Sequence, residues 1–518
     1  MSAIISAIPI LLLFVLMLGF KMAGHKSALV TFVVTILLAL FVAPALDMIP
    51  EQLVTANIYG LVGWSFVEGV LKAVFPILLI ILMAIYSYNI LVESKAINVI
   101  KDQFTSISDE RGVIVLILVW GFGGLLEGMA GFGTAVAIPA AILIGLGFKP
   151  MFSALVALLA NTVPTVFGAV GVPVTTLCNE ITPGGAAPLA VVSEVAQNAI
   201  IQLSALFFIL PFVILMLTDK KAWLKNLLLT LWTGAISLGV QFVCARYLGA
   251  ETPAIIGSLA AILAIILYTK LFGKKGATTT EKKHYTLAES FRAWSVYLFI
   301  LVFILVSGAL CPPVNDFLKT HLVSKIALPV IGSTFKFGWI CNAGLMLFLG
   351  ATIGGLIQGQ SIKQLMVILA RTVVNLKNTI ITIVCLISLA SVMNYSGMIS
   401  AIATGLVAVT GSAYPLVAPL IGAIGTFVTG SDTSSNILFA KLQANVAAQL
   451  GLDPTQTNWL VAANTTGASG GKMISPQSIA VATAACDMQG KDGAILKSSI
   501  PYALLYVVIS GLVVYFGL

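Results

Sequence analysis

Long apolar runs alternate with short polar turns along most of this chain. Segments 9–20, 73–92 and 502–516 are apolar on every side, without the alternation over ~10 residues that strands of a membrane barrel would show. One helical crossing of a bilayer needs ~20 such residues. The sequence therefore predicts an all-α integral membrane protein with about 12 to 14 crossings or half-crossings.

A shared polar pattern interrupts the apolar runs at two distant places. Residues 145–173 and 451–476 both combine glycines, prolines and small polar side chains, and Asn161-Thr162 in the first matches Asn464-Thr465 in the second. A second glycine-rich break precedes each copy, at Gly131-Phe132-Gly133-Thr134 and Gly430-Ser431-Asp432-Thr433. Paired, interrupted helices in corresponding halves of a chain are the best sequence indication of the binding site of a secondary transporter.

Interrupted helices at membrane depth favour a polar cavity. Hydrocarbon offers no partners to backbone N–H and C=O groups, so non-helical backbone is tolerated there only inside protein or beside water. The amino termini of half-helices direct N–H groups and partial positive charge into such a gap, where an anion fits. The alternative is that small residues merely let helices pack closely. Two copies matched in order and spacing favour the cavity.

Composition and charge agree with a membrane-embedded chain. Hydrophobic residues make up 59% of the sequence and charged residues 9%, and the mean hydropathy is +1.07. The first apolar segment runs into Lys21, His25 and Lys26, which predicts a retained first helix, an amino terminus outside and a cytoplasmic first loop. The polar stretch 270–292 is the predicted cytoplasmic linker. The net charge of +8 suits loops beside anionic lipid, and no nucleic acid is predicted as a partner.

The sequence lacks most motifs of metal-binding proteins, cofactor-binding proteins and enzymes. The six cysteines are scattered singly without a CxxC pair and the three histidines fall in predicted loops, so no metal, disulfide or cofactor is predicted. No HExxH motif occurs. A GxxxxGK[ST] nucleotide loop would need glycine at 466 and serine or threonine at 473, where the chain has Thr466 and Met473. A membrane-embedded enzyme is therefore disfavoured.

Four motifs resemble those of one known family. They read EGMAGFGTAVAIPAAIL (127–143), ALLANTVPTVFGAVGVP (157–173), TGSDTSSNILFAKLQ (429–443) and GGKMISPQSIAVA (470–482). In this order, and over nearly the whole chain, they resemble the lactate permease family. The resemblance implies a proton-coupled importer of L-lactate, D-lactate or glycolate in the ion transporter superfamily. It also implies two inverted repeats, each with a re-entrant hairpin followed by a discontinuous helix.

The layout that the resemblance implies has four parts. They are N-terminal peripheral helices (1–55), a first repeat (56–250, hairpin about 128–147, broken helix about 151–172), linking helices (251–340) and a second repeat (341–518, hairpin about 430–450, broken helix about 456–482). Inversion would place the turn at Lys149 inside and the matched turn at Asp453 outside.

Two carboxyl groups stand at the mouths of the glycine-rich breaks. Glu127 follows the apolar run 113–126, and Asp432 occupies nearly the same place in the second repeat. A charge in mid-helix disfavours membrane insertion by ~2.5 to 3.5 kcal/mol, so each is a functional candidate. A buried carboxyl can hold a proton near neutral pH and release it when wetted, which predicts proton coupling at Glu127 and Asp432. The alternative is that both only cap helix amino termini.

Lys472 is the predicted cation at the substrate. The glycines before it let the backbone open toward a ligand while its ammonium attracts a carboxylate. The alternative is an ammonium that reaches the membrane interface or bonds free carbonyl groups. The predicted substrate-binding residues are Asn161, Thr162, Ser431, Thr433, Ser434, Asn464, Thr465, Gly471 and Lys472.

Other charged residues in apolar surroundings have simpler explanations. Glu68 and Lys72 are four residues apart on one predicted helix face and are expected to pair with each other. Arg371 and Lys441 are further candidate cations at the substrate, and amphipathic surface helices explain them about as well.

The resulting hypothesis is a multi-pass symporter of the plasma (inner) membrane for small 2-hydroxymonocarboxylates, driven by protons. Its predicted partners are a small carboxylate such as lactate or glycolate, protons and membrane lipid, with a homo-oligomer left open. Sodium coupling stays an alternative because carbonyl and hydroxyl groups at broken helices also coordinate Na⁺. An ion antiporter of the same superfamily and an anion channel are further alternatives.

Overall fold

The structure, a computed structural model, describes residues 2–20, 22–50, 53–54, 56–105, 107–108, 110–129, 131, 133–272, 285–307, 311–488 and 491–518. Lys21, Phe132 and most of the predicted linker (273–284) lie outside these residues. Within the described ranges, nine helices are long and apolar enough to cross a membrane, or up to eleven if each bent pair is one span, and three shorter apolar helices accompany them. Together they reach the expected 12 to 14 crossings or half-crossings.

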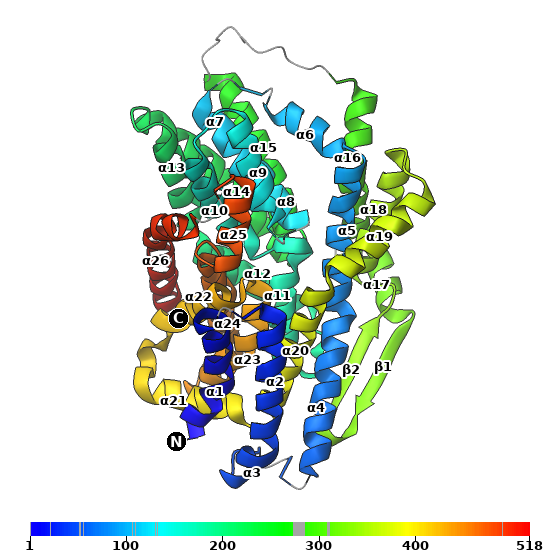
Figure 1. The fold of residues 1–518 in the computed structure, drawn as a ribbon, viewed down its shortest axis with the longest axis vertical. Helices are drawn as coiled ribbons and strands as arrows, with labels where there is room; N and C mark the ends of the chain where they lie inside the picture. The colour runs from blue at the N-terminus through cyan, green and yellow to red at the C-terminus, as the bar shows by residue number, and fades with distance from the viewer. Residues whose placement is uncertain are drawn as a thin grey trace.

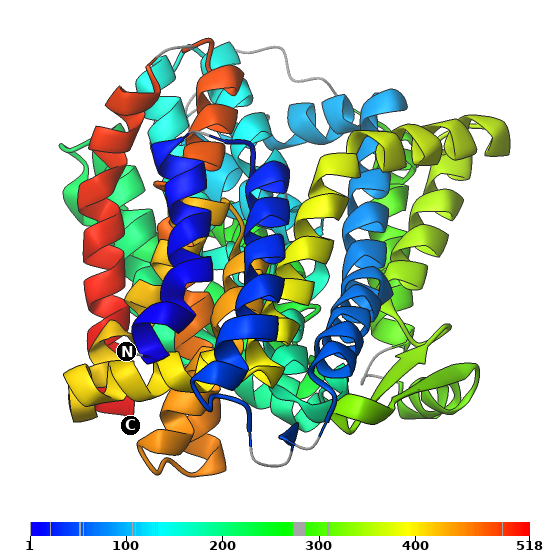
Figure 2. The same ribbon diagram turned by 60° about the horizontal axis from the view of Figure 1, so that its bottom comes forward.

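The amino-terminal helices lie in two groups, with a later helix (Lys377–Tyr395) packed between them (Figures 1 and 2). They are α1 (Ser2–Phe14), α2 (Gly24–Leu37), α3 (Ala43–Ala45), α4 (Ile58–Lys72), α5 (Leu79–Glu93) and α6 (Ala96–Thr105). π-helical turns extend α1 and α2 and join α4 to α5, at Val15–Gly19, Leu38–Val42 and Ala73–Leu78. Figure 2 shows the α1–α2 turn at the top of the molecule and both chain termini toward the bottom.

The first set of interrupted helices reverses direction at glycines. α7 (Arg111–Leu116), a π-helical turn (Ile117–Phe122) and α8 (Gly123–Met129) form one arm, and α9 (Thr134–Gly145) packs back against it. Gly131 and Gly133 have φ of +61° and +85°, which favours glycine at this reversal. The arm α7–α8 begins well before residue 128, so the observed hairpin is longer than the one expected from the sequence.

The broken helix of this set is α10 (Pro150–Thr165) with α11 (Gly168–Ile181), and the two halves meet at 49°. Ala169 and Val170 have φ of +44° and +59°, a left-handed conformation that is strained for residues with a side chain. The break lies within the predicted range of 151–172, although the second half continues to residue 181.

A second set follows the same order near the carboxyl terminus. α22 (Tyr414–Thr429) reverses through Gly430 and Ser431 into α23 (Asp432–Gln449), and α24 (Pro454–Lys472) is separated from α25 (Pro476–Ala485) by residues 473–475. Figure 1 shows α8, α9 and α10 in the upper half of the molecule and α22, α23 and α24 in the lower half. The two sets therefore approach the middle from opposite ends.

The remaining elements surround these two sets. They are α12 (Leu189–Leu203), α13 (Leu206–Thr218), α14 (Trp223–Leu248), α15 (Pro253–Phe272), α16 (Leu287–Ser307), α17 (Pro312–Thr320), β1 (Val323–Leu328), β2 (Ser333–Gly338), α18 (Ala343–Ile357), α19 (Ile362–Asn375), α20 (Lys377–Tyr395), α21 (Met398–Thr410) and α26 (Asp492–Gly517). The antiparallel hairpin β1–β2 was not expected among linking helices; its Leu328 and Phe335 pack with Leu61 of α4 in a small separate core.

Glycines let α22 and α24 pack backbone against backbone. A Cβ atom added at Gly467 would lie 1.8 Å from the carbonyl oxygen of Pro419, and one at Gly471 would lie 2.1 Å from that of Ala423. At Gly422 the distance to the carbonyl oxygen of Asn464 would be 2.0 Å. Small residues permit such close approach of helices in membranes. This contact, called the glycine seam below, fixes α22 against α24.

Candidate functional site

A cavity of about 450 Å³ lies where the two interrupted sets meet. Four helix amino termini border it: α9 through Gly133, α11 through Pro173, which follows the left-handed residues 169–171, α23 through Asp432 and α25 through Pro476. Helix amino termini carry free N–H groups and partial positive charge. Their convergence gives the cavity the electrostatic character of an anion site.

An ion pair between the two sets closes one side of the cavity. Lys472, the last residue of α24, donates to Glu127 Oε1 of α8 at 2.7 Å and to Thr165 Oγ1 of α10 at 3.2 Å. The first distance is that of a strong charge-assisted hydrogen bond. Glu127 is 2% exposed, and its Oε2 is a buried atom with no hydrogen-bond partner among the described residues. That oxygen is therefore available to a proton or to a ligand hydroxyl.

Asp432 is the second carboxyl group at the cavity, and it is 3% exposed. It accepts hydrogen bonds from Ser469 Oγ at 2.9 Å and Thr465 Oγ1 at 3.3 Å. In the described part of the chain it makes no direct ion pair. One ammonium and two carboxyl groups share this cavity with His25, so with a neutral histidine its net charge is zero only when one carboxyl carries a proton.

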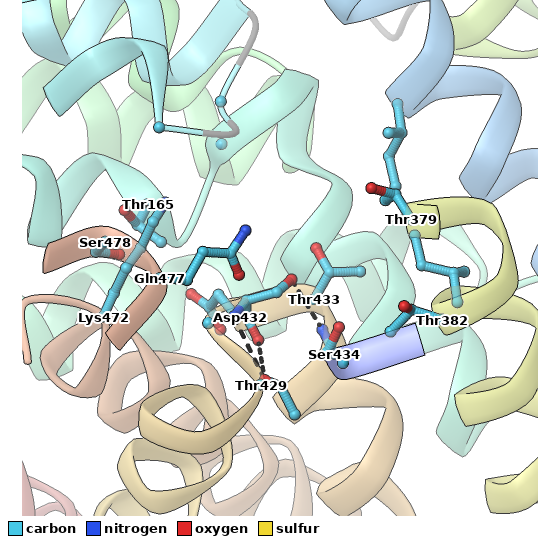
Figure 3. A pocket seen from close by; sticks show the side chains of 18 of the residues that line it. Thr165, Thr379, Thr382, Thr429, Asp432, Thr433, Ser434, Lys472, Gln477 and Ser478 are labelled. Carbon is cyan, nitrogen blue, oxygen red and sulfur yellow. Dashed lines mark hydrogen bonds between the residues drawn. The ribbon is translucent and has the colours of Figure 1, made fainter. Parts of the chain in front are cut away.

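Hydroxyl groups gather at the start of α23, beside Asp432 (Figure 3). Ser431 caps the helix by accepting from the N–H of Ser434 at 3.3 Å. Thr429 steadies the reversal because its Oγ1 donates to the carbonyl oxygen of Ser431 at 3.1 Å. Thr379 and Thr382 of α20 line the opposite wall. These donors suit the oxygen atoms of a small polar ligand.

The structure brings six of the predicted site residues to the cavity wall: Glu127, Ser431, Asp432, Thr433, Ser434 and Lys472. The other five are buried outside the lining. Asn464 donates to Asn436 Oδ1 at 2.9 Å, Thr465 donates to Asp432, and Gly471 lies in the glycine seam. Asn161 donates to Thr165 Oγ1 at 3.2 Å, and Thr162 donates to the carbonyl oxygen of Leu159 at 2.8 Å. One residue of each matched Asn-Thr pair thus supports a lining residue from behind: Asn161 contacts Thr165, and Thr465 contacts Asp432.

Several lining residues were not singled out from the sequence: Thr165, Thr379, Thr382, Thr429, Gln477 and Ser478. A usable signal existed for the last two. Ser475 caps α25 by accepting from the N–H of Ser478 at 3.2 Å, and Pro476 follows it at the first helical position. This combination is typical of a helix start. The residues of α20 carry no comparable signal, because they belong to an uninterrupted helix.

The letters Gly467-Ala468-Ser469-Gly470-Gly471 fit the GxSxG motif of serine hydrolases. The structure removes that interpretation. These residues lie inside α24 rather than at a turn between a strand and a helix, and Ser469 donates to Asp432. Ser469 is therefore a hydrogen-bond partner of a carboxyl group.

Comparison with known proteins decides the family. A family model described as L-lactate permease matches residues 2–517. The chain belongs to the L-lactate permease family. One similar protein is an L-lactate permease of Streptococcus iniae. It is 38% identical, and the alignment covers 88% of this chain and 92% of that permease. The glycolate permease GlcA of Escherichia coli K12 is 33% identical over 99% of this chain and 95% of its own length.

Among solved structures, the YdaH transporter of Alcanivorax borkumensis is similar at 14% sequence identity and a TM-score of 0.47. The alignment covers 94% of this chain and 97% of the YdaH chain. Membership of the L-lactate permease family makes this protein a multi-pass transporter of the cell membrane and not an enzyme. The resemblance of the four sequence motifs to this family is thereby confirmed.

Proposed function

We propose that this protein carries lactate, glycolate or a closely related 2-hydroxymonocarboxylate across the cell membrane together with a proton. The Glu127–Lys472 ion pair, in a cavity bordered by four helix amino termini, is the observation that carries the proposal. The names of the relatives supply the substrate class, since they are permeases for L-lactate and glycolate.

The substrate carboxylate binds Lys472 and the free N–H groups of the half-helices. Lys472 stands beside the starts of α23 and α25, so one carboxylate can meet both kinds of donor. The substrate hydroxyl then reaches the hydroxyl groups of Ser431, Thr433 and Ser434. Water occupies about 30 Å³ per molecule, so a cavity of about 450 Å³ holds a three-carbon acid with several waters.

Proton coupling follows from competition for Lys472. Glu127 and the substrate are both carboxylates, and an ammonium that holds one at 2.7 Å must release it to hold the other as closely. A proton on Glu127 removes its charge and frees Lys472, while Asp432, with only hydroxyl partners, keeps its own proton throughout. The site is then neutral both empty and loaded. One proton with one monoanion crosses without the ~2.3 kcal/mol per charge that 100 mV imposes.

Charge distribution indicates which side this conformation faces. Met22, Gly24 and His25, at the α1–α2 turn, line the cavity, so it extends toward the top of Figure 2. Lys220 lies in the turn between α13 and α14, and Lys225, in the first turn of α14, pairs with Glu110 at the start of α7, toward the top of Figure 1. Lysine and arginine are concentrated in cytoplasmic loops, so this face is assigned to the cytoplasm and the amino terminus to the outside.

Sodium coupling is the second candidate. Hydroxyl and carbonyl oxygens at the breaks could coordinate Na⁺. The Lys472 ammonium already places one positive charge at these oxygens, which disfavours a second cation there. An antiporter would need no organic acid, whereas this cavity combines an ammonium with four positive helix ends.

Uptake into proteoliposomes separates these candidates. An inward pH gradient without Na⁺ should drive accumulation of labelled L-lactate, and an inward Na⁺ gradient at equal pH should not. Accumulation that follows Na⁺ and ignores the pH gradient would contradict proton symport. Proton release in the absence of any hydroxy acid would indicate an antiporter. Counterflow against D-lactate, glycolate and propionate would rank the substrates and test the need for the hydroxyl.

A further inference from the structure

A second cavity, of about 670 Å³, is bordered by later residues of two helices that also border the first. Along α11, Pro173 lines the first cavity and Glu180 lines the second; along α23, Ser434 lines the first and Lys441 the second. A helix rises 1.5 Å per residue, so seven residues separate the two linings by about 10 Å. We call this second space the outer cavity, because β2 and the α11–α12 turn border it at the bottom of Figure 2.

Five charged side chains line the outer cavity: Lys336 of β2 is exposed, and the other four are buried. Glu68, Lys72, Glu180 and Lys441 are 1%, 5%, 2% and 8% exposed. The predicted pairing of Lys72 with Glu68 is confirmed at 3.5 Å, and Lys441 lies 3.3 Å from Glu180. Lys441 is therefore not on an exposed helix surface, which was one of the two explanations open from the sequence. Arg371 is on the surface, paired with Glu93 at 3.3 Å.

The carboxylate of Glu68 is well supplied with partners. It accepts from Tyr395 Oη at 3.0 Å and from Ser391 Oγ at 3.1 Å. The ammonium groups are less well supplied: each has three donors, and its carboxylate contact exceeds the 2.7–2.9 Å of a well-formed charged hydrogen bond. Lys72 and Lys441 therefore retain donors that can turn toward a ligand.

Two further observations indicate an anion that also carries a hydroxyl group. Lys72 and Lys441 are close enough for their like charges to repel, which an anion between them would offset. Glu180 Oε2 is buried and faces Lys441 Nζ at 3.3 Å without a well-formed hydrogen bond, so its second lone pair can accept one from a ligand hydroxyl. Asn394 and Asn445 add amide donors at the same cavity.

We propose that the outer cavity is a second binding site for a small 2-hydroxycarboxylate. Its carboxylate lies between Lys72 and Lys441 and its hydroxyl donates to Glu180. The substrate class rests on the proposed function, whereas the site itself rests on the geometry above. The site captures substrate on the face opposite to the opening of the first cavity, and so loads the protein from that face.

The test is the number of labelled L-lactate molecules bound per chain at saturation by the full-length protein in detergent. The wild type should bind two. Removing one partner of a buried ion pair leaves an unpaired charge, so charge-balanced double variants are used. Lys441→Gln with Glu180→Gln should bind one, as should Lys472→Gln with Glu127→Gln, and the fourfold variant should bind none. Lys325→Gln, in β1 near this face and outside the cavity lining, is the matched control and should bind two.

The outcomes separate the two proposals. A wild type that binds one lactate, unchanged in Lys441→Gln with Glu180→Gln, would overturn the outer site and leave the proposed function intact. The four charges would then be structural ion pairs. A wild type that binds no lactate would overturn the proposed function, and with it the ligand assigned to the outer cavity. Thermal unfolding of each double variant near the wild-type midpoint shows that a lost site is not a lost fold.

Discussion

Lys472 and Glu127 share a 2.7 Å hydrogen bond although 345 residues separate them in the sequence. One residue ends the first half of a broken helix and the other lies in the arm of a hairpin from the opposite half of the chain. Each set of interrupted helices thus supplies one charge of the pair. A ligand that displaces either partner changes how the two sets are held together, which links binding to rearrangement.

A variant that neutralises one residue of this ion pair should be less stable than a variant that neutralises both. Lys472→Gln leaves Glu127 buried without its cation, which should lower the free energy of unfolding by about 3 kcal/mol or more. Lys472→Gln with Glu127→Gln removes both charges and should unfold near the wild-type midpoint, yet transport no lactate. Detergent thermal unfolding and proteoliposome uptake give the two readouts. Equal destabilisation of the single and double variants would contradict a direct pair.

Glu127→Gln alone should separate transport from the proton gradient. The neutral amide leaves Lys472 free at every pH, so lactate exchange across the membrane should continue. In the wild type, net uptake should depend on the pH gradient, because a proton carried by Glu127 crosses with each lactate. In Glu127→Gln that pH dependence should disappear, and uptake should follow the membrane potential. Accumulation driven by a pH gradient alone in this variant would assign the proton elsewhere.

Asp432→Asn distinguishes the two predicted proton-coupling residues. If Asp432 keeps its proton throughout the cycle, an amide reproduces its charge and can accept a hydrogen bond from one of Ser469 and Thr465 while donating to the other. Uptake driven by a pH gradient should then stay within about threefold of the wild type, which corresponds to less than ~1 kcal/mol. Loss of pH-driven uptake with preserved exchange would make Asp432 the coupling group instead.

Cysteine labelling should reveal the side to which the first cavity opens. In a variant without the six native cysteines, Thr382→Cys should react with a membrane-impermeant thiol reagent from the cytoplasmic face, since Thr382 lines the cavity that reaches His25. Lys325→Cys in β1 should react from outside only. Lactate should slow labelling at Thr382→Cys and leave Lys325→Cys unaffected. Labelling of both positions from one side would contradict the assigned orientation.

The glycine seam predicts a large effect from a single methyl group. Gly467→Ala places Cβ against the carbonyl oxygen of Pro419, and such overpacking typically destabilises by about 1–3 kcal/mol. Gly493→Ala in α26 is the matched control, because nothing lies within 4 Å of its Cβ position and alanine favours a helix. Thermal unfolding should show a lower midpoint for Gly467→Ala only. Equal unfolding midpoints for the two variants would contradict direct backbone contact between α22 and α24.

Local sequence patterns were enough to find the interrupted helices and most of the charges that meet there. Glycine, proline and capping residues act on the backbone within a few positions, so the breaks at Gly131, Gly430 and Lys472 were visible without a structure. The pairing of Lys472 with Glu127 was not, because it depends on how two halves of the chain come together. Lys441 with Glu180 escaped for the same reason.

The positions of the Asn-Thr pairs show a second limit. Asn161 and Asn464 resemble ligand-binding residues because amides are rare in apolar runs, yet both point into supporting hydrogen bonds. Helical periodicity does not give the direction of a side chain next to a helix break, because the break changes the angle between successive side chains around the helix axis. The hairpin β1–β2 was missed because its strands are only six residues long and stand among helical runs.

The glycine seam makes the second hairpin and its broken helix one mechanical unit. Backbones in direct contact leave no room for an ion or an acid to slip between α22 and α24, and neither helix can slide along the other without a clash. Both cavities instead lie along the margin of this unit, against α20. A solute therefore passes between this unit and α20, and not through the unit. Passage requires α22 and α24 to move together relative to α20.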